Sequence, residues 1–335
     1  MTKHIETIDI LKGITIILVV IGHAVQGVAS SQHLTLNTEY SSIFILKQII
    51  YGFHMPLFFI IAGLFINSWV KRSFKEAILQ KILRLLIPYF FWSFITALSM
   101  QFASSYTNNG LGIKEFLLSP IIPFSQYWFL YVLFFIHVIY YILININLFN
   151  SKLFFLLVSI ILYFLNPLFD NIWIFDSLCK YMIYFSIGTY ILDFINIRQF
   201  RYNSTIILPI ICFLLVNIIY IAILYFDNNL LIYYFGFITS IVGSGFCFFI
   251  SYYIENKIKI MKDILCFFGK KSMEIYCVHL LVLAGIRILL LKFFNFNELW
   301  SIVIISGSIT LIICYNIFSR LSYEKTKIRL LFGLK

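Results

Sequence analysis

The chain has 335 residues, of which 61% are hydrophobic, 19% aromatic and only 12% charged, with a formal net charge of +11. Ordinary globular domains are about one quarter charged and about half apolar, so this composition excludes a water-soluble enzyme, a disordered chain, a collagen and a disulfide scaffold. The basic residues lie in short loops between apolar runs, which is typical of membrane topology and not of a nucleic-acid partner.

Ten apolar runs are long enough to cross a bilayer, which takes about 20 residues. The sequence therefore predicts an all-α integral membrane protein, a bundle of about ten transmembrane helices that forms a single domain over residues 1–335. The expected spans are 8–28, 51–70, 83–103, 127–147, 153–169, 178–195, 205–226, 230–254, 272–292 and 299–321.

The basic residues predict the orientation of these spans. With the N-terminus in the cytoplasm, 20 of the 25 Lys and Arg residues face that side, and an even number of spans returns the C-terminus to it. The five that lie outside or near outer helix ends are Lys47, Lys114, Lys180, Arg287 and Lys292. No small-residue cleavage site follows the first run, so we expect that run to stay in the mature protein. The expected location is the cytoplasmic membrane of a bacterium.

The first span carries two polar side chains that are costly in lipid. Lys12 and His23 are separated by three helical turns and about 16 Å of rise, so they share one face. Gly13 and Gly22 beside them permit close approach of a neighbouring helix or a ligand. A functional stripe is one interpretation; a lysine that snorkels to the interface and a structurally bonded histidine is the other.

The second and third spans add a histidine and an arginine. His54 lies in the run Phe53-His54-Met55-Pro56-Leu57-Phe58-Phe59 and is expected about one turn inside the outer boundary, at a depth comparable with that of His23. Arg84 lies at the cytoplasmic rim, four residues before Pro88, where a guanidinium can bind a phosphate in a two-pronged hydrogen bond or simply anchor the helix.

The later spans carry further candidates. Tyr127 and Trp128 begin the fourth span, where an interfacial aromatic belt is the simpler interpretation and stacking on a sugar ring the other. His137, deeper in the same span, is expected to bond within the bundle. In the ninth span the polar residues indicate either a lined tunnel or a bonded core; they are Glu274, Tyr276 and His279.

These residues in this order resemble the integral-membrane acyltransferase family 3. The resemblance rests on Lys12 with His23, the Phe53–Phe59 run, Arg84 with Pro88, and the late Ile275-Tyr276 with His279, and it covers nearly the whole chain. The chain has Lys at position 12, where many members have Arg, and the C-terminal hydrolase-like domain of some members is not expected here.

The resemblance implies an O-acyltransferase. Such an enzyme moves an acyl group, commonly acetyl, from cytoplasmic acyl-coenzyme A as co-substrate to a hydroxyl of a cell-surface or lipid-linked glycan. It implies that His23 is the catalytic histidine and that Lys12 and Arg84 bind the coenzyme. His23 is expected to act as general base, without a metal or a permanently bound cofactor, although an acyl-histidine route stays open. His54 is expected to orient His23 or to bind the acceptor or the oxyanion.

Two other classes of protein fit the composition. One is a transporter or flippase for a lipid-linked saccharide, and the other is an assembly component for an exopolysaccharide without catalytic activity. The chain shows neither an internal repeat nor paired membrane carboxylates, which disfavours a transporter.

Overall fold

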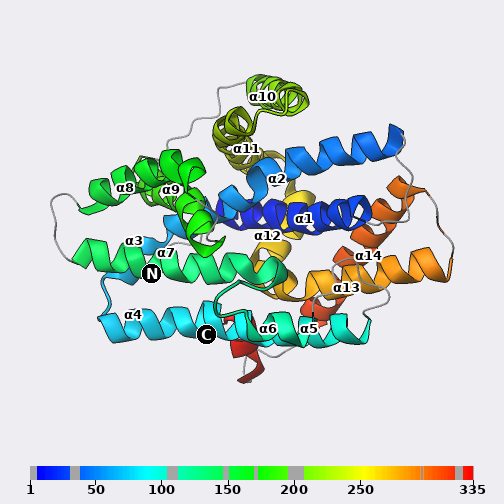
Figure 1. Cartoon of the computed structure of the whole chain (residues 1–335), viewed down its shortest axis with the longest axis horizontal. Coiled ribbons are helices and arrows are strands. Elements are labelled where there is room, and N and C mark those ends of the chain that lie inside the picture. The colour runs from blue at the N-terminus through cyan, green and yellow to red at the C-terminus, as the bar shows by residue number, and fades with distance from the viewer. Residues whose placement is uncertain are drawn as a thin grey trace. The chain divides into compact units, whose positions relative to one another are not determined.

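The computed structural model describes most of the chain, and the described part is built of helices without a strand (Figure 1). The described residues are 6–30, 38–103, 112–145, 151–169, 173–194, 207–294, 296, 298–320 and 327–334. They divide into two compact units, each assembled from separate stretches of the sequence. The expectation of one domain stays a prediction.

Unit 1 is built around the first helix, α1 (Glu6–Ala29). Four later helices pack directly on it: α11 (Asn229–Lys257), α12 (Lys259–Lys270), α13 (Ser272–Lys292) and α14 (Leu299–Arg320). The unit also holds α10 (Ile207–Tyr225), which packs on α11, and the part of α2 (Thr38–Leu64) that ends at Met55. Because α1 is covered by so many neighbours, most of its side chains are buried.

Two glycines allow α12 to pack closely on the first half of α1. A methyl group on Gly13 would overlap the backbone carbonyl of Leu265, and one on Gly269 would overlap the backbone carbonyl of Asp9. Each helix thus places a glycine against the backbone of the other, which brings the two axes together as small residues do in membrane helix pairs. The position next to Lys12 is fixed by this packing.

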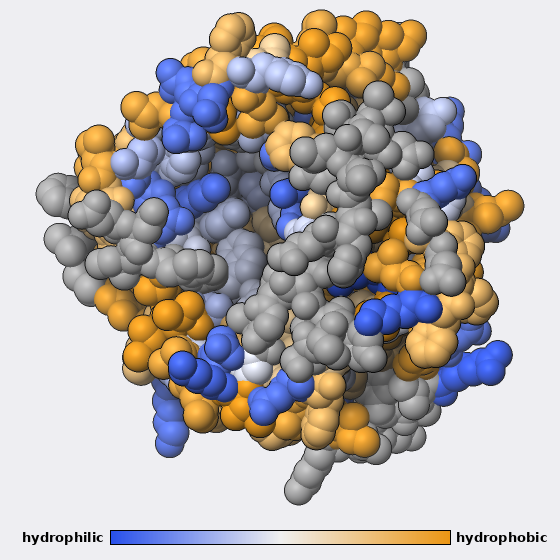
Figure 2. Space-filling view, turned by 45° about the vertical axis from the view of Figure 1, so that its right-hand side comes forward, coloured by the Kyte–Doolittle hydropathy of each residue, from blue (hydrophilic) through white to orange (hydrophobic). Residues whose placement is uncertain are grey.

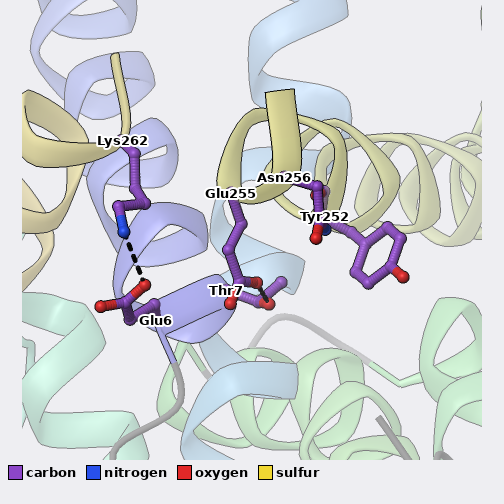
Figure 3. A network of polar contacts seen from close by, with 6 residues as sticks. All are labelled: Glu6, Thr7, Tyr252, Glu255, Asn256 and Lys262. Atoms are coloured by element: carbon purple, nitrogen blue, oxygen red, sulfur yellow. Dashed lines mark hydrogen bonds and ion pairs between the residues drawn. The ribbon is translucent and has the colours of Figure 1, made fainter. Parts of the chain in front are cut away.

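Polar contacts join the start of α1 to α11 and α12 (Figure 3). Lys262 Nζ donates to Glu6 at 2.9 Å, and this hydrogen bond raises the pKa of Lys262. The Thr7 hydroxyl donates to the carboxylate of Glu255 on α11, beside Tyr252 and Asn256. The N-terminal end of α1 is therefore held from two sides.

Unit 2 contains the remaining helices. Its central element is α7 (Trp128–Asn145), on which α4 (Phe74–Lys81), η1 (Ile82–Leu86), α8 (Ser151–Leu165) and α9 (Trp173–Phe194) pack. The other members are the part of α2 from Pro56, α3 (Ile66–Val70), α5 (Ile87–Phe102) up to Ala97, α6 (Ile113–Leu117), η3 (Ser125–Tyr127), η4 (Asn166–Leu168) and η5 (Lys327–Phe332).

The described helices agree closely with the predicted spans. Nine stretches are long and apolar enough to cross a membrane, and they correspond to nine of the ten predicted spans. The sixth prediction, 178–195, coincides with α9, which is helical but carries Asp176 and Lys180 and is not among the nine candidates. The ten-span count and the cytoplasmic termini stay predictions.

The structure differs from the prediction at α2 and at α12. Helix α2 begins at Thr38 rather than at residue 51, because the polar Lys47 and Gln48 are part of the helix. The candidate span is Ser42–Leu64, and His54 lies near its middle rather than one turn from its start; the depth of His54 in the bilayer stays a prediction. Pro56 does not end the helix, which continues to Leu64. The amphipathic α12 was not predicted, since it is too short to span a bilayer.

Many large apolar side chains are exposed on the described surface. On α10 the exposed residues include Ile207, Leu208, Leu214, Leu215 and Ile218, each more than half exposed. Hydrophobic side chains also cover much of the face seen in Figure 2. Exposed apolar surface on this scale needs lipid around it, so the chain is a multi-pass membrane protein.

Candidate functional site

Two imidazoles meet inside unit 1. The rings of His23 on α1 and His279 on α13 lie 5.1 Å apart between centroids at an interplanar angle of 45°. His279 is 0% exposed, whereas His23 is partly exposed. The sequence suggested a tunnel role for His279; the structure places it directly beside the predicted catalytic histidine.

The hydrogen bonds of His279 determine its tautomer. Its Nδ1 lies 2.8 Å from the carbonyl oxygen of Tyr276 and 3.2 Å from that of Ile275. A carbonyl oxygen only accepts, so Nδ1 carries the hydrogen and Nε2 of the neutral ring presents a lone pair. No hydrogen-bond partner of this Nε2 occurs among the described residues. An unsatisfied buried acceptor costs about 1–3 kcal/mol, and such an atom indicates a place for a donor from outside the chain.

Tyr51 on α2 connects His23 with the third imidazole. Its hydroxyl lies 3.5 Å from His23 Nδ1, a long contact in which either atom is the donor. The Tyr51 ring stands edge-on to that of His54, with centroids 4.8 Å apart. His54 is buried, and its Nδ1 donates to the Ile50 carbonyl oxygen at 2.7 Å. His54 therefore supports Tyr51, and Tyr51 in turn contacts His23.

Lys12 lies on the same face of α1 as His23, three turns nearer its N-terminus. Its side chain is partly buried, and Asp9 is close enough to interact with it electrostatically. The neighbouring Gly13 is covered by α12, which fixes the backbone at this position. A cation and an imidazole thus stand about 16 Å apart along one helix face.

The predicted polar cluster of α13 is divided between two faces. Glu274 is buried and forms an ion pair with Lys271, with 3.4 Å between Oε1 and Nζ. Tyr276 is also buried, and its ring lies 5.9 Å from that of His279. Residues three apart share a helix face and residues five apart do not, so Tyr276 belongs with the imidazoles and Glu274 does not.

Arg84 belongs to unit 2, where it joins a group of cations. It is exposed, lies in the π-helical turn η1, and is close enough to Lys81 and Arg72 to interact with both electrostatically. Lys81 also stands over the ring of Trp69, with 4.9 Å from Nζ to the centroid. Gly333, beside η5, packs against the Arg84 carbonyl. Three neighbouring cations can bind a polyanion.

The aromatic pair at the start of α7 has two different surroundings. Tyr127 is 0% exposed and its hydroxyl hydrogen bonds with that of Thr96 at 2.9 Å, so the interfacial-belt interpretation is wrong for this residue. Trp128 is partly exposed, and its ring packs on those of Tyr181 and Phe59 in unit 2. A sugar-stacking role for Trp128 stays a prediction.

His137 is a structural residue. It is buried in unit 2 between Trp69 and Phe185, and its Nδ1 donates to the Leu133 carbonyl oxygen at 2.7 Å. The expectation that it bonds within the bundle is confirmed.

Tyr51 is the residue of this site that the sequence analysis missed. Tyr51 and His54 are three residues apart and therefore share a helix face, a signal that is already readable in the predicted span 51–70. The predicted start of the span at residue 51 placed Tyr51 at the membrane boundary and hid its role.

The arrangement in unit 1 has the parts of a general-base site. An imidazole with a neighbouring hydroxyl and a second imidazole can accept a proton and share the resulting charge. Among the described residues, no three His, Cys, Asp or Glu side chains gather into a group that could hold a metal ion.

Comparisons with known proteins cover nearly the whole chain. The family model described as an acyltransferase domain (acyltransferase 3) matches residues 5–319. The nodulation protein NolL of Sinorhizobium fredii is 34% identical over 128 residues, which is 37% of this chain and 32% of NolL. The nodulation protein NolL of Mesorhizobium japonicum is 36% identical over 87 residues, 25% of this chain and 21% of that protein. The matched region thus spans about a third or less of these relatives. No solved structure matches.

Proposed function

Because the chain belongs to the acyltransferase 3 family, we propose that it transfers an acyl group from acyl-coenzyme A to a hydroxyl of a cell-surface or lipid-linked glycan. Acetyl is the proposed group. The observation that carries the proposal is the His23–His279 pair, in which a buried Nε2 without a donor among the described residues lies beside the proposed base. A second hydroxyl of the acceptor sugar supplies the donor that this place needs, while the reacting hydroxyl faces His23.

The proposed reaction is a direct acyl transfer. His23 takes the proton of the acceptor hydroxyl while the hydroxyl oxygen attacks the thioester carbonyl carbon. The carbon–sulfur bond of the tetrahedral intermediate then breaks. The His23 imidazolium returns its proton to the departing thiolate, so an ester and free coenzyme A are the products. General-base assistance of this kind contributes about 10² to 10⁴ in rate.

The neighbours of His23 have separate roles in this proposal. His279 accepts a hydrogen bond at Nε2 from a second hydroxyl of the acceptor sugar, which holds the reacting hydroxyl at His23. Tyr51 holds the other side of the His23 ring through its hydroxyl, and His54 packs on Tyr51. His54 is therefore proposed as a positioning residue.

The donor side is proposed to be the N-terminal end of α1. Lys12 neutralises a phosphate of the coenzyme, and the pantetheine arm covers the roughly 16 Å to His23. In unit 2, the exposed Arg84 with Lys81 and Arg72 supplies a further group of cations for phosphate. A bidentate guanidinium–phosphate contact is the strongest interaction available there.

We also propose the orientation in the membrane. If α9 crosses the bilayer together with the nine candidate spans, both termini lie in the cytoplasm, as the distribution of basic residues indicates. Lys12 then faces the cytoplasmic donor, and the C-terminal end of α1 faces the glycan outside the cytoplasmic membrane.

The direct test is acyl transfer in inverted membrane vesicles. Vesicles that contain the full chain and enclose a glycan acceptor in their lumen receive radiolabelled acetyl-coenzyme A outside, and label in the glycan is counted. The proposal expects transfer by the parent protein and a loss of at least 100-fold in His23→Gln, with unchanged binding of acetyl-coenzyme A. His137→Gln is the matched control, because it makes the same change at a buried histidine of unit 2 that bonds to its own helix.

Each outcome separates the alternatives. A transporter or a non-catalytic assembly component transfers no label. Full transfer by His23→Gln refutes the role of His23 as general base. An acyl-histidine route leaves hydroxylamine-sensitive label on the protein when the acceptor is omitted, whereas direct transfer leaves none. Lys12→Ala is expected to weaken donor binding more than acceptor binding, and equal weakening contradicts its donor role.

A further inference from the structure

Arg287 is a cation inside a membrane helix next to the imidazole site. It lies on α13 in unit 1, eight residues after His279, and its guanidinium packs against Gly27 of α1. Gly27 follows His23 by four residues, so it lies one turn and about 6 Å beyond His23 on the same face. Arg287 therefore stands just past the imidazole pair, on the side opposite Lys12.

The described residues offer Arg287 no counter-charge. No ion pair or hydrogen bond joins it to a residue whose side chain the structure describes, and it is only partly exposed. Its charged group rests on a glycine rather than extending beyond the end of the helix, which is five residues away at Lys292. A charged side chain within a membrane helix is costly and faces a partner or a wet cavity, so its counter-charge is expected from a ligand.

Lys47 adds a second cation at the same level. It precedes Tyr51 by one turn on α2, and Tyr51 contacts both His23 and the position of Gly22 on α1. Helices α1 and α2 run antiparallel in unit 1 (Figure 1), so Lys47 also lies beyond the imidazoles toward the C-terminal end of α1. Lys47 is partly exposed and stands over the ring of Phe44 at 5.9 Å, without an acidic partner among the residues whose side chains the structure describes.

We propose that Arg287, with Lys47, binds an anionic group of the acceptor. The inference rests on the proposed function, in which the donor enters from the Lys12 end and the acceptor from the opposite end. A carboxylate of an acidic sugar and a phosphate of a lipid carrier present the same chemistry, two oxygens that match a guanidinium fork. Binding there places a hydroxyl of the adjoining sugar about one helical turn away, at His23.

Equilibrium binding tests this without relying on catalysis. The full chain is placed in nanodiscs of zwitterionic lipid and titrated with three tritiated probes. They are a neutral glucose tetrasaccharide, the same oligosaccharide with one glucuronate, and an isoprenyl-diphosphate-linked glucose. The parent is expected to bind at least one charged probe ten times more tightly than the neutral one, and the probe that binds identifies the source of the charge.

Arg287→Gln is expected to abolish that preference. The dissociation constant of the charged probe should rise by about tenfold to a hundredfold, which is the range of one charge-assisted hydrogen bond. Arg287→Lys is expected to retain part of the preference. Arg320→Gln, an equal loss of charge on an exposed arginine at the other end of unit 1, is the matched control and leaves probe binding unchanged. Acetyl-coenzyme A binding verifies that each variant is folded.

Equal affinity of the parent for all three probes, weak binding of both charged probes, or a preference that survives in Arg287→Gln overturns the inference. Displacement of the bound charged probe by added anionic lipid also overturns the inference, since Arg287 then binds a lipid headgroup. Tight binding at Arg287 without any acyl transfer refutes the proposed function and leaves the anion site intact.

Discussion

Replacing Gly269 with alanine measures how strongly the α1–α12 packing holds the donor end of the site. The added Cβ would lie 2.7 Å from the carbonyl carbon and 3.1 Å from the Cα of Asp9 and would overlap the carbonyl oxygen. These are backbone atoms, so no side-chain rotation relieves the overlap and α12 must move away from α1. Overpacking of this kind costs about 3 kcal/mol at its upper end. Alanine regains about 1 kcal/mol of helix propensity.

The expected net loss is therefore about 2 kcal/mol, or about 30-fold in the unfolding equilibrium. Unfolding of the purified protein by SDS in mixed micelles, followed by circular dichroism, measures this difference. Gly285→Ala is the matched control, because a Cβ there meets nothing within 4 Å and gains only the helix propensity. We also expect weaker acetyl-coenzyme A binding in Gly269→Ala, since Asp9 is one turn from Lys12. Equal stability of the two variants would refute the packing argument.

Three further changes test other contacts. Tyr51→Phe removes the hydroxyl beside His23 Nδ1 but keeps the ring on His54. We expect kcat to fall about fivefold, as for a lost hydrogen bond of about 1 kcal/mol, with the KM for acetyl-coenzyme A unchanged. A change confined to KM contradicts the proposed role of Tyr51. Glu255→Gln weakens the bond from Thr7, so stability in SDS should decrease by about 1 kcal/mol without loss of the site's activity. Gly333→Ala places a side chain at φ 67° and against the Arg84 carbonyl, which costs about 1–2 kcal/mol. Because this displaces Arg84, we expect weaker binding of acetyl-coenzyme A. An unchanged dissociation constant would show that Arg84 does not bind the donor.

The sequence by itself determined the class of fold and most of the helices. A membrane span is defined by local properties, namely length and the near absence of charge, and both can be read from 20 consecutive residues. The predicted start of α2 was wrong because polar residues such as Lys47 continue the helix, and α12 was missed because it is amphipathic and too short to span. The face shared by Lys12 and His23 also follows from local helix geometry.

The tertiary structure decided which polar residues act together. His279 and Arg287 are far from His23 in the sequence, and only the packing of α13 on α1 brings them to His23 and Gly27. The division of the α13 polar residues, with Glu274 on Lys271 and Tyr276 beside His279, likewise depends on the neighbouring helices. Hydropathy depends on each residue alone, whereas a site depends on contacts between distant segments, and those contacts are set by how the helices pack.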